Sequence, residues 1–207
     1  MIYLSDDYLD KYINTFGYIF ARSIKEGYSF SYIEKSISYS SMVEELERSN
    51  ITTIAFSSSE EIYHDLLPLY SNNDFVYNPY DEFGWLGYIY VHLFLHFQIT
   101  FELLFIILPI EKALSLYKIY HEMDISQTYA FFKESVKYSY LDNIMKAKNI
   151  SINELSNASG ISKSTINFLK YGKREIAKLE SQKLFKLSKQ LNIKMTTLLV
   201  SLELELQ

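Results

Sequence analysis

The sequence predicts a mainly α-helical protein built from two parts, residues 1–138 and residues 139–207. Charge separates the parts, because residues 139–207 hold 11 Lys and Arg against 6 Asp and Glu, whereas residues 1–138 hold 9 against 19. Aromatic residues separate them again, since only three of the 34 Phe, Tyr and Trp residues lie beyond residue 140. Apolar residues recur at helical spacing in both parts, so we expect helices throughout, with one or two short strands at most.

The N-terminal part is predicted to be a series of helices. They are expected over 6–25, 31–38, 41–48 and 58–67, followed by two or three more within 82–138. Ser58 and Glu61 have the spacing of a capping box, which favours a helix that begins there. Thr100 and Pro109 mark breaks between the later helices. The β-branched run 51–56 is typical of a strand.

Three histidines in this part are the candidate ligands of a catalytic metal. His92 and His96 have the i, i+4 spacing that metal sites use, and His121 lies further along the chain. The residues between the first two are Leu-Phe-Leu, so the HExxH pattern of metalloproteases is missing. Histidines on an aromatic helix are more typical of core or interface side chains, and the chain has no cysteine for a thiol nucleophile. We therefore predict no catalytic residue, no metal and no cofactor, with a metal-dependent enzyme as the alternative.

The segment 83–101 contains no Asp, Glu, Lys or Arg, which makes it a candidate membrane span. His92, His96 and Gln98 interrupt it, and polar groups at bilayer depth are costly. We therefore predict a buried helix pair and no contact with a membrane; a cytoplasmic location is implied mainly by the family resemblance described below.

Residues 151–172, SINELSNASGISKSTINFLKYG, have the pattern of two short helices joined by a tight turn. Ser151 and Ser162 are suitable N-caps, because a serine hydroxyl accepts a backbone N–H that the first helical turn leaves unpaired. Gly160 stands where the first helix must end, and glycine adopts the left-handed conformation without steric cost. Gly172 ends the second helix, and two basic residues follow it.

This pattern resembles the helix-turn-helix domain of the phage repressor and Cro family, over residues 140–199. The residues that carry the resemblance are Glu154-Leu155, Gly160, Ser164-Thr165-Ile166 and Tyr171-Gly172-Lys173. It implies a compact five-helix DNA-binding domain with helices over 140–148, 152–159, 163–170, 181–191 and 195–202. The chain departs from the family at Ile152, where a glutamine usually contacts backbone phosphate and braces the recognition helix.

The resemblance also implies roles for individual side chains. Residues at the start of the recognition helix and one turn further reach base edges, and here these are Lys163, Ser164, Asn167 and Phe168. Lys163 is suited to guanine, Asn167 to adenine and Phe168 to a thymine methyl group. Burial of Phe168 against the fourth helix is an equal alternative. The side chains suited to phosphates are Ser151, Lys170, Lys173 and Arg174.

A dimer is implied as well, because such domains bind paired half-sites about one helical turn apart. The fifth helix is the usual contact surface in the family, and here it carries Met195, Leu198, Leu199 and Leu202. The alternating tail 202–206 is suited either to a strand that pairs across the dimer axis or to a frayed end.

A basic end on an acidic chain is what phosphate binding requires, because neutralised phosphates release counterions. We therefore predict a sequence-specific transcription regulator, a repressor that binds a double-stranded DNA operator as a homodimer. Repressor-type domains occur at the C-terminus of several bacterial antitoxins, so the resemblance favours an autoregulating antitoxin of a toxin–antitoxin system. In that role the acidic, aromatic residues 1–138 bind a basic protein partner, the toxin. The alternatives are a stand-alone repressor whose residues 1–138 sense a small molecule, and the metal-dependent enzyme.

Overall fold

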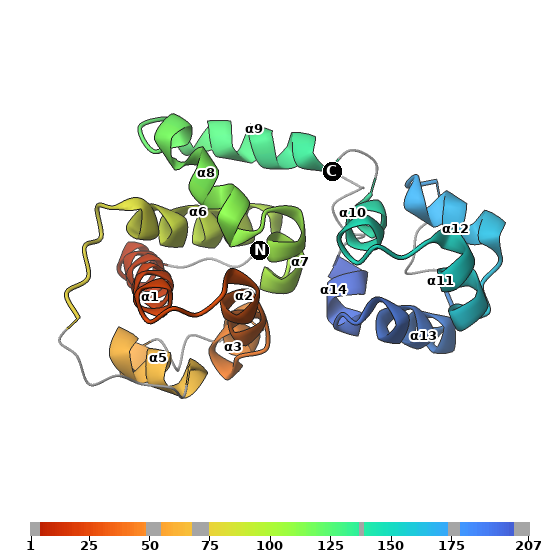
Figure 1. Ribbon diagram of the computed structural model, residues 1–207, viewed down its shortest axis with the longest axis horizontal. Coiled ribbons are helices and arrows are strands. Elements are labelled where there is room, and N and C mark those ends of the chain that lie inside the picture. Colours follow the sequence, from red (N-terminus) through yellow and green to blue (C-terminus); the bar gives the residue numbers. More distant parts are fainter. Residues whose placement is uncertain (1–4, 49–54, 68–74, 137–138, 174–178, 201–207) are drawn as a thin grey trace. The chain divides into compact units, whose positions relative to one another are not determined.

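The computed structural model contains thirteen α-helices and no strand among the residues that it describes (Figure 1). These are residues 5–48, 55–67, 75–136, 139–173 and 179–200. The chain divides into two compact units, Met1–Tyr129 and Ala130–Gln207, and the boundary falls within one helix, α9. The predicted mainly helical class is therefore confirmed.

Eight of the helices belong wholly or partly to the first unit. They are α1 (Asp6–Lys25), α2 (Phe30–Ser38), α3 (Ser41–Glu47), α5 (Ser59–Leu66), α6 (Glu82–Phe97), α7 (Phe101–Ile107), α8 (Ile110–Tyr120) and α9 (Ile125–Ser135). The capping box of Ser58 and Glu61 is present at the start of α5. The predicted breaks are also confirmed, since Thr100 is the N-cap of α7 and Pro109 that of α8.

Two predictions for this unit are wrong. Residues 82–135 form four helices rather than two or three. The additional helix begins at α9, where the Asp124 carboxylate accepts the backbone N–H of Ser126 at 2.9 Å. Ala55 and Phe56 are helical, so the strand predicted over 51–56 is wrong at these two positions, and 51–54 lie outside the described residues. Strand propensity is a weak preference that tertiary surroundings override.

Helix α1 packs directly against α6, and glycines allow the close approach (Figure 1). A Cβ atom at Gly87 of α6 would lie 2.3 Å from the carbonyl oxygen of Ile13 and 2.6 Å from the nitrogen of Gly17, both on α1. A Cβ atom at Gly17 would in turn lie 3.2 Å from the Cα atom of Gly84. The two helices therefore meet backbone to backbone, and a methyl group would force them apart.

Aromatic rings from α1, α6 and α7 fill the core around this crossing. Phe101 stacks on Phe16 at 4.6 Å and on Phe94 at 5.0 Å between ring centres, and Phe20 lies 5.5 Å from Tyr90. Among the described residues, no single helix is both long and apolar enough to cross a membrane. Helices α6 and α7 meet those criteria only as a pair, bent by 112° at the break between them.

One arginine lies in the interior of the unit with its charge paired. The Arg22 side chain is 2% exposed, and its Nε donates to Glu26 at 3.1 Å while its Nη1 donates to Glu60 at 3.1 Å. The guanidinium also lies 4.9 Å from the centre of the Tyr63 ring. Glu60 and Tyr63 belong to α5, whereas Arg22 belongs to α1. Because a buried guanidinium without a partner is costly, these contacts hold α5 against α1.

Two carboxylates cap helices that lie far along the chain from them. Glu47 accepts the backbone N–H of Phe101, the first residue of α7, at 3.1 Å. Glu34 accepts the backbone N–H of Ile110, the first residue of α8, at 2.8 Å. Burial raises the pKa of Glu34. Since the first amides of a helix have no partner within it, α2 and α3 supply the acceptors that α7 and α8 need.

The second unit contains the end of α9 and five further helices. They are α10 (Tyr140–Ala147), α11 (Ile152–Ser159), α12 (Lys163–Lys170), α13 (Ser181–Leu191) and α14 (Met195–Val200). The first four agree with the predicted ranges to within one residue, whereas the predicted end of the fifth, 201–202, lies outside the described residues. The core of this unit consists of buried aliphatic side chains, among them Leu141, Ile144, Leu155, Ile166, Leu169, Leu187 and Leu191.

Candidate nucleic-acid interface

The first helix of the turn motif, α11, begins at a complete capping box. The Ser151 hydroxyl accepts the backbone N–H of Glu154 at 3.2 Å. The Glu154 carboxylate accepts the backbone N–H of Ser151 at 2.8 Å and its hydroxyl at 2.7 Å. These hydrogen bonds from Ser151 lower the pKa of Glu154. The hydroxyl that the sequence assigned to a phosphate contact is thus already engaged within the helix start.

The turn between α11 and α12 has the conformation that its residues predict. Gly160 has a φ of +72° and its N–H donates to the Ser156 carbonyl at 2.9 Å. The Ser156 hydroxyl donates to the Ile161 carbonyl at 2.7 Å, which fixes the far side of the turn. Ser162 then caps α12 by accepting the backbone N–H of Thr165 at 3.2 Å. Local hydrogen bonds therefore set the direction in which α12 leaves the turn.

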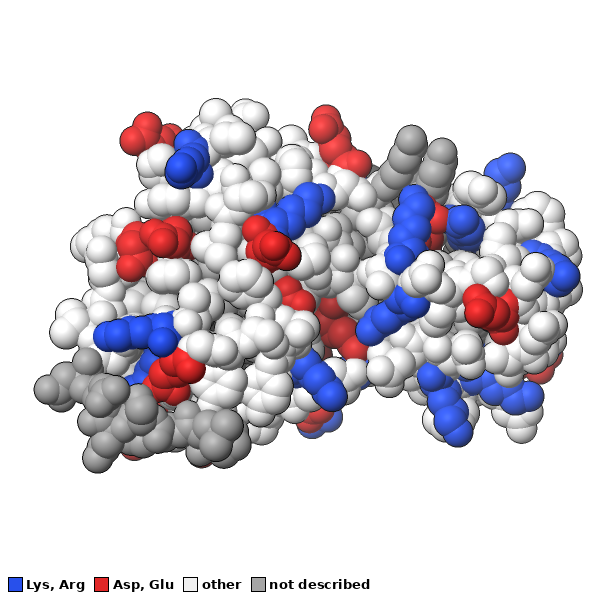
Figure 2. Space-filling model, viewed as in Figure 1, with Lys and Arg blue, Asp and Glu red and all other residues white. Residues whose placement is uncertain are grey.

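A groove of about 800 Å³ lies beside α12, bounded by the end of α10 and the start of α11. Three lysines and two carboxylates line it, together with Asn167: Lys146, Lys163, Lys170, Asp142 and Glu154. Figure 2 shows Lys and Arg side chains spread over the visible face of the α10–α14 region, with few acidic ones among them. The charged side chains that line the groove are therefore cationic in balance, which favours phosphate.

The structure brings together four of the eight residues predicted to contact DNA. Ser151, Lys163, Asn167 and Lys170 all line the groove. The remaining base-contacting candidates lie outside its lining but are exposed on α12, namely Ser164 and Phe168. Phe168 is 50% exposed, so its burial against the fourth helix is not found. Lys173 is exposed just beyond the end of α12, and Arg174 lies outside the described residues.

Asp142 is a residue of this groove that the sequence interpretation missed. Its side chain is 1% exposed, with the Lys146 Nζ at 2.5 Å and the Lys170 Nζ at 3.3 Å. Lys170 also lies 5.6 Å from the centre of the Tyr171 ring. One buried carboxylate therefore pairs with two lysines that line the groove. Of these two ion pairs, only Asp142–Lys146 has a spacing, i, i+4, that the sequence reveals.

The predicted dimer residues differ in accessibility within the unit. Met195 is 41% exposed and Leu199 is half-buried. Leu198 is fully buried, so in this unit it packs inside the core rather than on the surface. Leu202 and the tail 203–207 lie outside the described residues.

The three histidines considered for a metal are engaged by other groups. His96 stacks on Tyr129 with ring centres 3.9 Å apart, and the Tyr129 hydroxyl lies 3.4 Å from the Nδ1 atom of His92. Burial lowers the pKa of His92. The Nδ1 atom of His121 lies 2.8 Å from the Tyr117 carbonyl oxygen. Within the described part of the chain, no group of three or more His, Cys, Asp and Glu side chains is placed to hold a metal ion.

Comparison with known families identifies the second unit. Residues 140–201 match the model of the Cro/C1-type HTH DNA-binding domain. Residues before 140 match no family model, and neither a curated protein nor a solved structure matches the chain. The matched range covers α10–α14, so it includes the capping box, the turn and the groove described above. The C-terminal unit is therefore a Cro/C1-type helix-turn-helix DNA-binding domain, and the protein that carries it is a DNA-binding transcription regulator.

Proposed function

We propose that the protein is a sequence-specific repressor that inserts α12 into the major groove of its operator. The observation that supports this is the placement of Lys163 and Asn167 on one exposed face of α12, in the same groove as Lys146 and Lys170. Long basic and amide side chains on such a face suit guanine and adenine edges, and the flanking lysines suit phosphates. Ser164 and Phe168 extend the base-contacting face along the helix.

Substitutions on α12 test this assignment. Lys163→Ala and Asn167→Ala should each cost about 1–3 kcal/mol of specific binding, or roughly 5-fold to 150-fold in Kd, and relax the preference at one base pair. Lys173→Ala should instead weaken binding to all duplexes alike and reduce the dependence of log K on log salt by about 1. Lys189→Ala is the matched control, because Lys189 is an exposed lysine of α13 outside the groove.

The measurement is fluorescence anisotropy with a fragment of the protein's own promoter and a scrambled duplex of equal length, over a range of salt concentrations. Equal losses on both duplexes for Lys163→Ala would show that this lysine contacts backbone rather than bases. No binding of the promoter fragment at low ionic strength would refute the proposal as a whole.

The repressor acts as a homodimer in this proposal, through the exposed face of α14 and the residues that follow it. Met195 and Leu199 are the candidates for direct contact, whereas the buried Leu198 supports the helix from inside. Met195→Glu should lower the dimer fraction in analytical ultracentrifugation and weaken binding to paired half-sites more than to one half-site. A dimer that survives both this substitution and removal of 203–207 would place the interface elsewhere.

We further propose that the first unit binds a protein partner, as in an autoregulating antitoxin of a bacterial cytoplasm. Residues 1–138, which contain this unit and the rest of α9, carry a net charge of −10. Several large apolar side chains of the unit are exposed, among them Tyr32, Tyr39 and Ile119. Acidic surfaces with exposed aromatic rings suit a basic protein. Co-expression with the product of the neighbouring gene tests this: the partner should be toxic alone, and a soluble complex should neutralise it. A harmless neighbour, or one that does not bind, refutes the antitoxin role.

A second candidate function is that of a stand-alone repressor whose first unit senses a small molecule. The observation that favours it is an aromatic-lined cavity within that unit, formed by α1, α6, α8 and α9. A sensor of this kind needs no neighbouring toxin gene, and its affinity for the operator changes when the ligand is added.

A further inference from the structure

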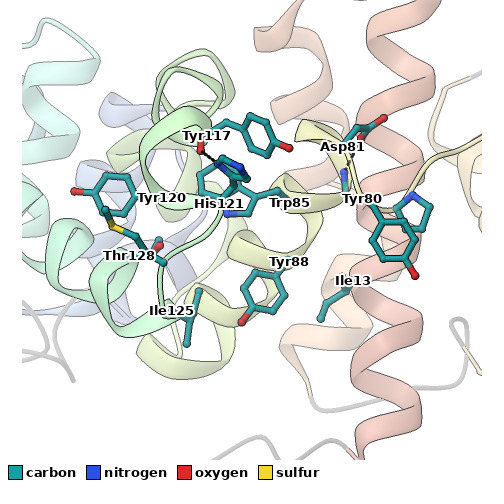
Figure 3. A pocket seen from close by; sticks show the side chains of 13 residues that line it. Ile13, Tyr80, Asp81, Trp85, Tyr88, Tyr117, Tyr120, His121, Ile125 and Thr128 are labelled. Carbon is teal, nitrogen blue, oxygen red and sulfur yellow. Dashed lines mark hydrogen bonds between the residues drawn. The ribbon is translucent and has the colours of Figure 1, made fainter.

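The cavity of the first unit has a volume of about 350 Å³, which is within the range of small-molecule sites. The start of α6 and the end of α8 supply most of its wall, with Ile13 of α1 and the first turn of α9 completing it (Figure 3). Six of its lining residues carry aromatic rings: Tyr80, Trp85, Tyr88, Tyr117, Tyr120 and His121. A cavity of this size accommodates one small molecule rather than a segment of protein.

The aromatic wall is held in place by contacts among its own members. The Trp85 and Tyr117 rings meet edge to face with centres 5.6 Å apart, and the His121 ring lies 4.5 Å from that of Tyr117. The hydrogen-bond contact between His121 Nδ1 and the Tyr117 carbonyl is drawn in Figure 3. Trp85 is 9% exposed, so only a small part of its ring faces the open space. The rings are therefore positioned before any ligand arrives.

The charged groups at the cavity are acidic. Within the part of the chain that the structure describes, no Lys or Arg lines it, whereas the Asp81 carboxylate does. Asp81 accepts the backbone N–H groups of Phe83 and Gly84 at 2.9 and 3.2 Å, which fixes the carboxylate at the start of α6. Burial raises the pKa of the Tyr88 phenol, and the negative charge of Asp124 raises it further. A bound cation would therefore meet a negative potential and aromatic faces together.

We propose that this cavity binds a small organic cation, held against the aromatic faces and neutralised by Asp81. The faces of Trp and Tyr rings carry partial negative charge and attract ammonium groups, an attraction that strengthens when the site excludes water. The lack of Lys and Arg among the described lining residues disfavours an anion, and the carboxylate disfavours a neutral apolar ligand. The inference rests on the second candidate function, the small-molecule sensor, and names the class of ligand for its cavity; every lining residue belongs to the first unit.

Trp85 is the only tryptophan of the chain, so intrinsic fluorescence measures this cavity selectively. The probe is choline, and its control is 3,3-dimethyl-1-butanol, which has the same shape without the charge. Choline should change Trp85 emission saturably, and the alcohol should need about tenfold higher concentration or more. Potassium chloride is added to the alcohol titration so that both probes are compared at the same ionic strength. No response to choline, or equal responses to both probes, overturns the proposal without any variant having to fold.

Two variants then locate the site. Asp81→Asn keeps a capping side chain at the start of α6 but removes the charge, and should weaken choline binding about fivefold with little effect on the alcohol. Asp65→Asn is its matched control, because Asp65 is an exposed carboxylate of α5 that does not line the cavity. Tyr117→Leu should weaken choline binding about fivefold by removing a ring face. Equal affinities for Asp81→Asn and Asp65→Asn would show that Asp81 does not neutralise the ligand.

Discussion

The buried carboxylate of Asp142 should limit DNA affinity while it stabilises the domain. In Asp142→Asn the shape of the side chain is kept and the charge is lost, so the ion pairs with Lys146 and Lys170 are broken. We expect the domain to become less stable and non-specific DNA binding to become tighter. The two effects have opposite signs, which separates them from general damage to the fold.

The distances and exposures set the size of the stability loss. Ion pairs at 2.5 and 3.3 Å would be worth about 7 and about 5 kcal/mol in a medium with an effective dielectric constant of about 20. Desolvation of a carboxylate that is only 1% exposed offsets most of that gain. The lysine side chains are 62% and 22% exposed and regain water when released. We therefore expect a net loss of about 1–3 kcal/mol in the free energy of unfolding.

The effect on DNA follows from the charge of the groove. One negative charge disappears, so the Asp142 carboxylate no longer competes with phosphates for the Lys146 and Lys170 ammonium groups. The slope of log K against log salt should therefore steepen by about 1, with a corresponding gain in affinity at low salt. Glu180→Gln is the matched control, since Glu180 is an exposed carboxylate of the same unit that pairs with Lys183 at 3.0 Å.

Urea unfolding followed by circular dichroism measures the stability, and anisotropy with a duplex of unrelated sequence measures the binding. An Asp142→Asn variant as stable as the native protein would refute a stabilising role for this carboxylate. Binding of DNA no tighter than that of Glu180→Gln would refute its competition with phosphates.

Three further predictions concern the fold. Gly87→Ala should lower the free energy of unfolding, measured in urea, by about 1–2 kcal/mol, because a Cβ atom there would lie 2.3 Å from the Ile13 carbonyl oxygen. The higher helix propensity of alanine offsets only part of this loss. An unchanged urea midpoint would contradict the close backbone contact. Stability should fall as the pH drops below about 6.5, since burial lowers the pKa of His92 and the unfolded chain takes up the proton first; His92→Gln should flatten the stability–pH profile. Ser151→Ala should cost about 1 kcal/mol of stability, and a native-like melting curve would exclude its capping role.

The helices of the second unit could be predicted almost residue by residue, because their ends are set by local chemistry. Ser151 and Ser162 accept amides three residues ahead of them, and Gly160 takes a positive φ. Such contacts depend on neighbours in the sequence and leave a readable pattern. The same holds for the capping box of Ser58 in the first unit.

The features that could not be predicted depend on residues distant in the sequence. Nothing near Glu47 indicates that its carboxylate accepts an amide 54 residues further on. Lys170 has the exposure pattern of a phosphate-contacting lysine, but its pairing with Asp142 arises only when α12 packs beside α10. The cavity around Trp85 likewise requires four separate helices to meet, so the aromatic composition alone could not locate it.

The carboxylates of Glu34 and Glu47 set a lower limit on how far the protein can be shortened. A fragment that started after α3 would keep α7 and α8 but lose the two acceptors for their leading amides. Those amides would then lie against the apolar core without a hydrogen-bond acceptor or water. Expression of such a fragment should yield aggregates rather than a smaller folded module, so attempts to dissect partner binding should retain the whole stretch up to α9.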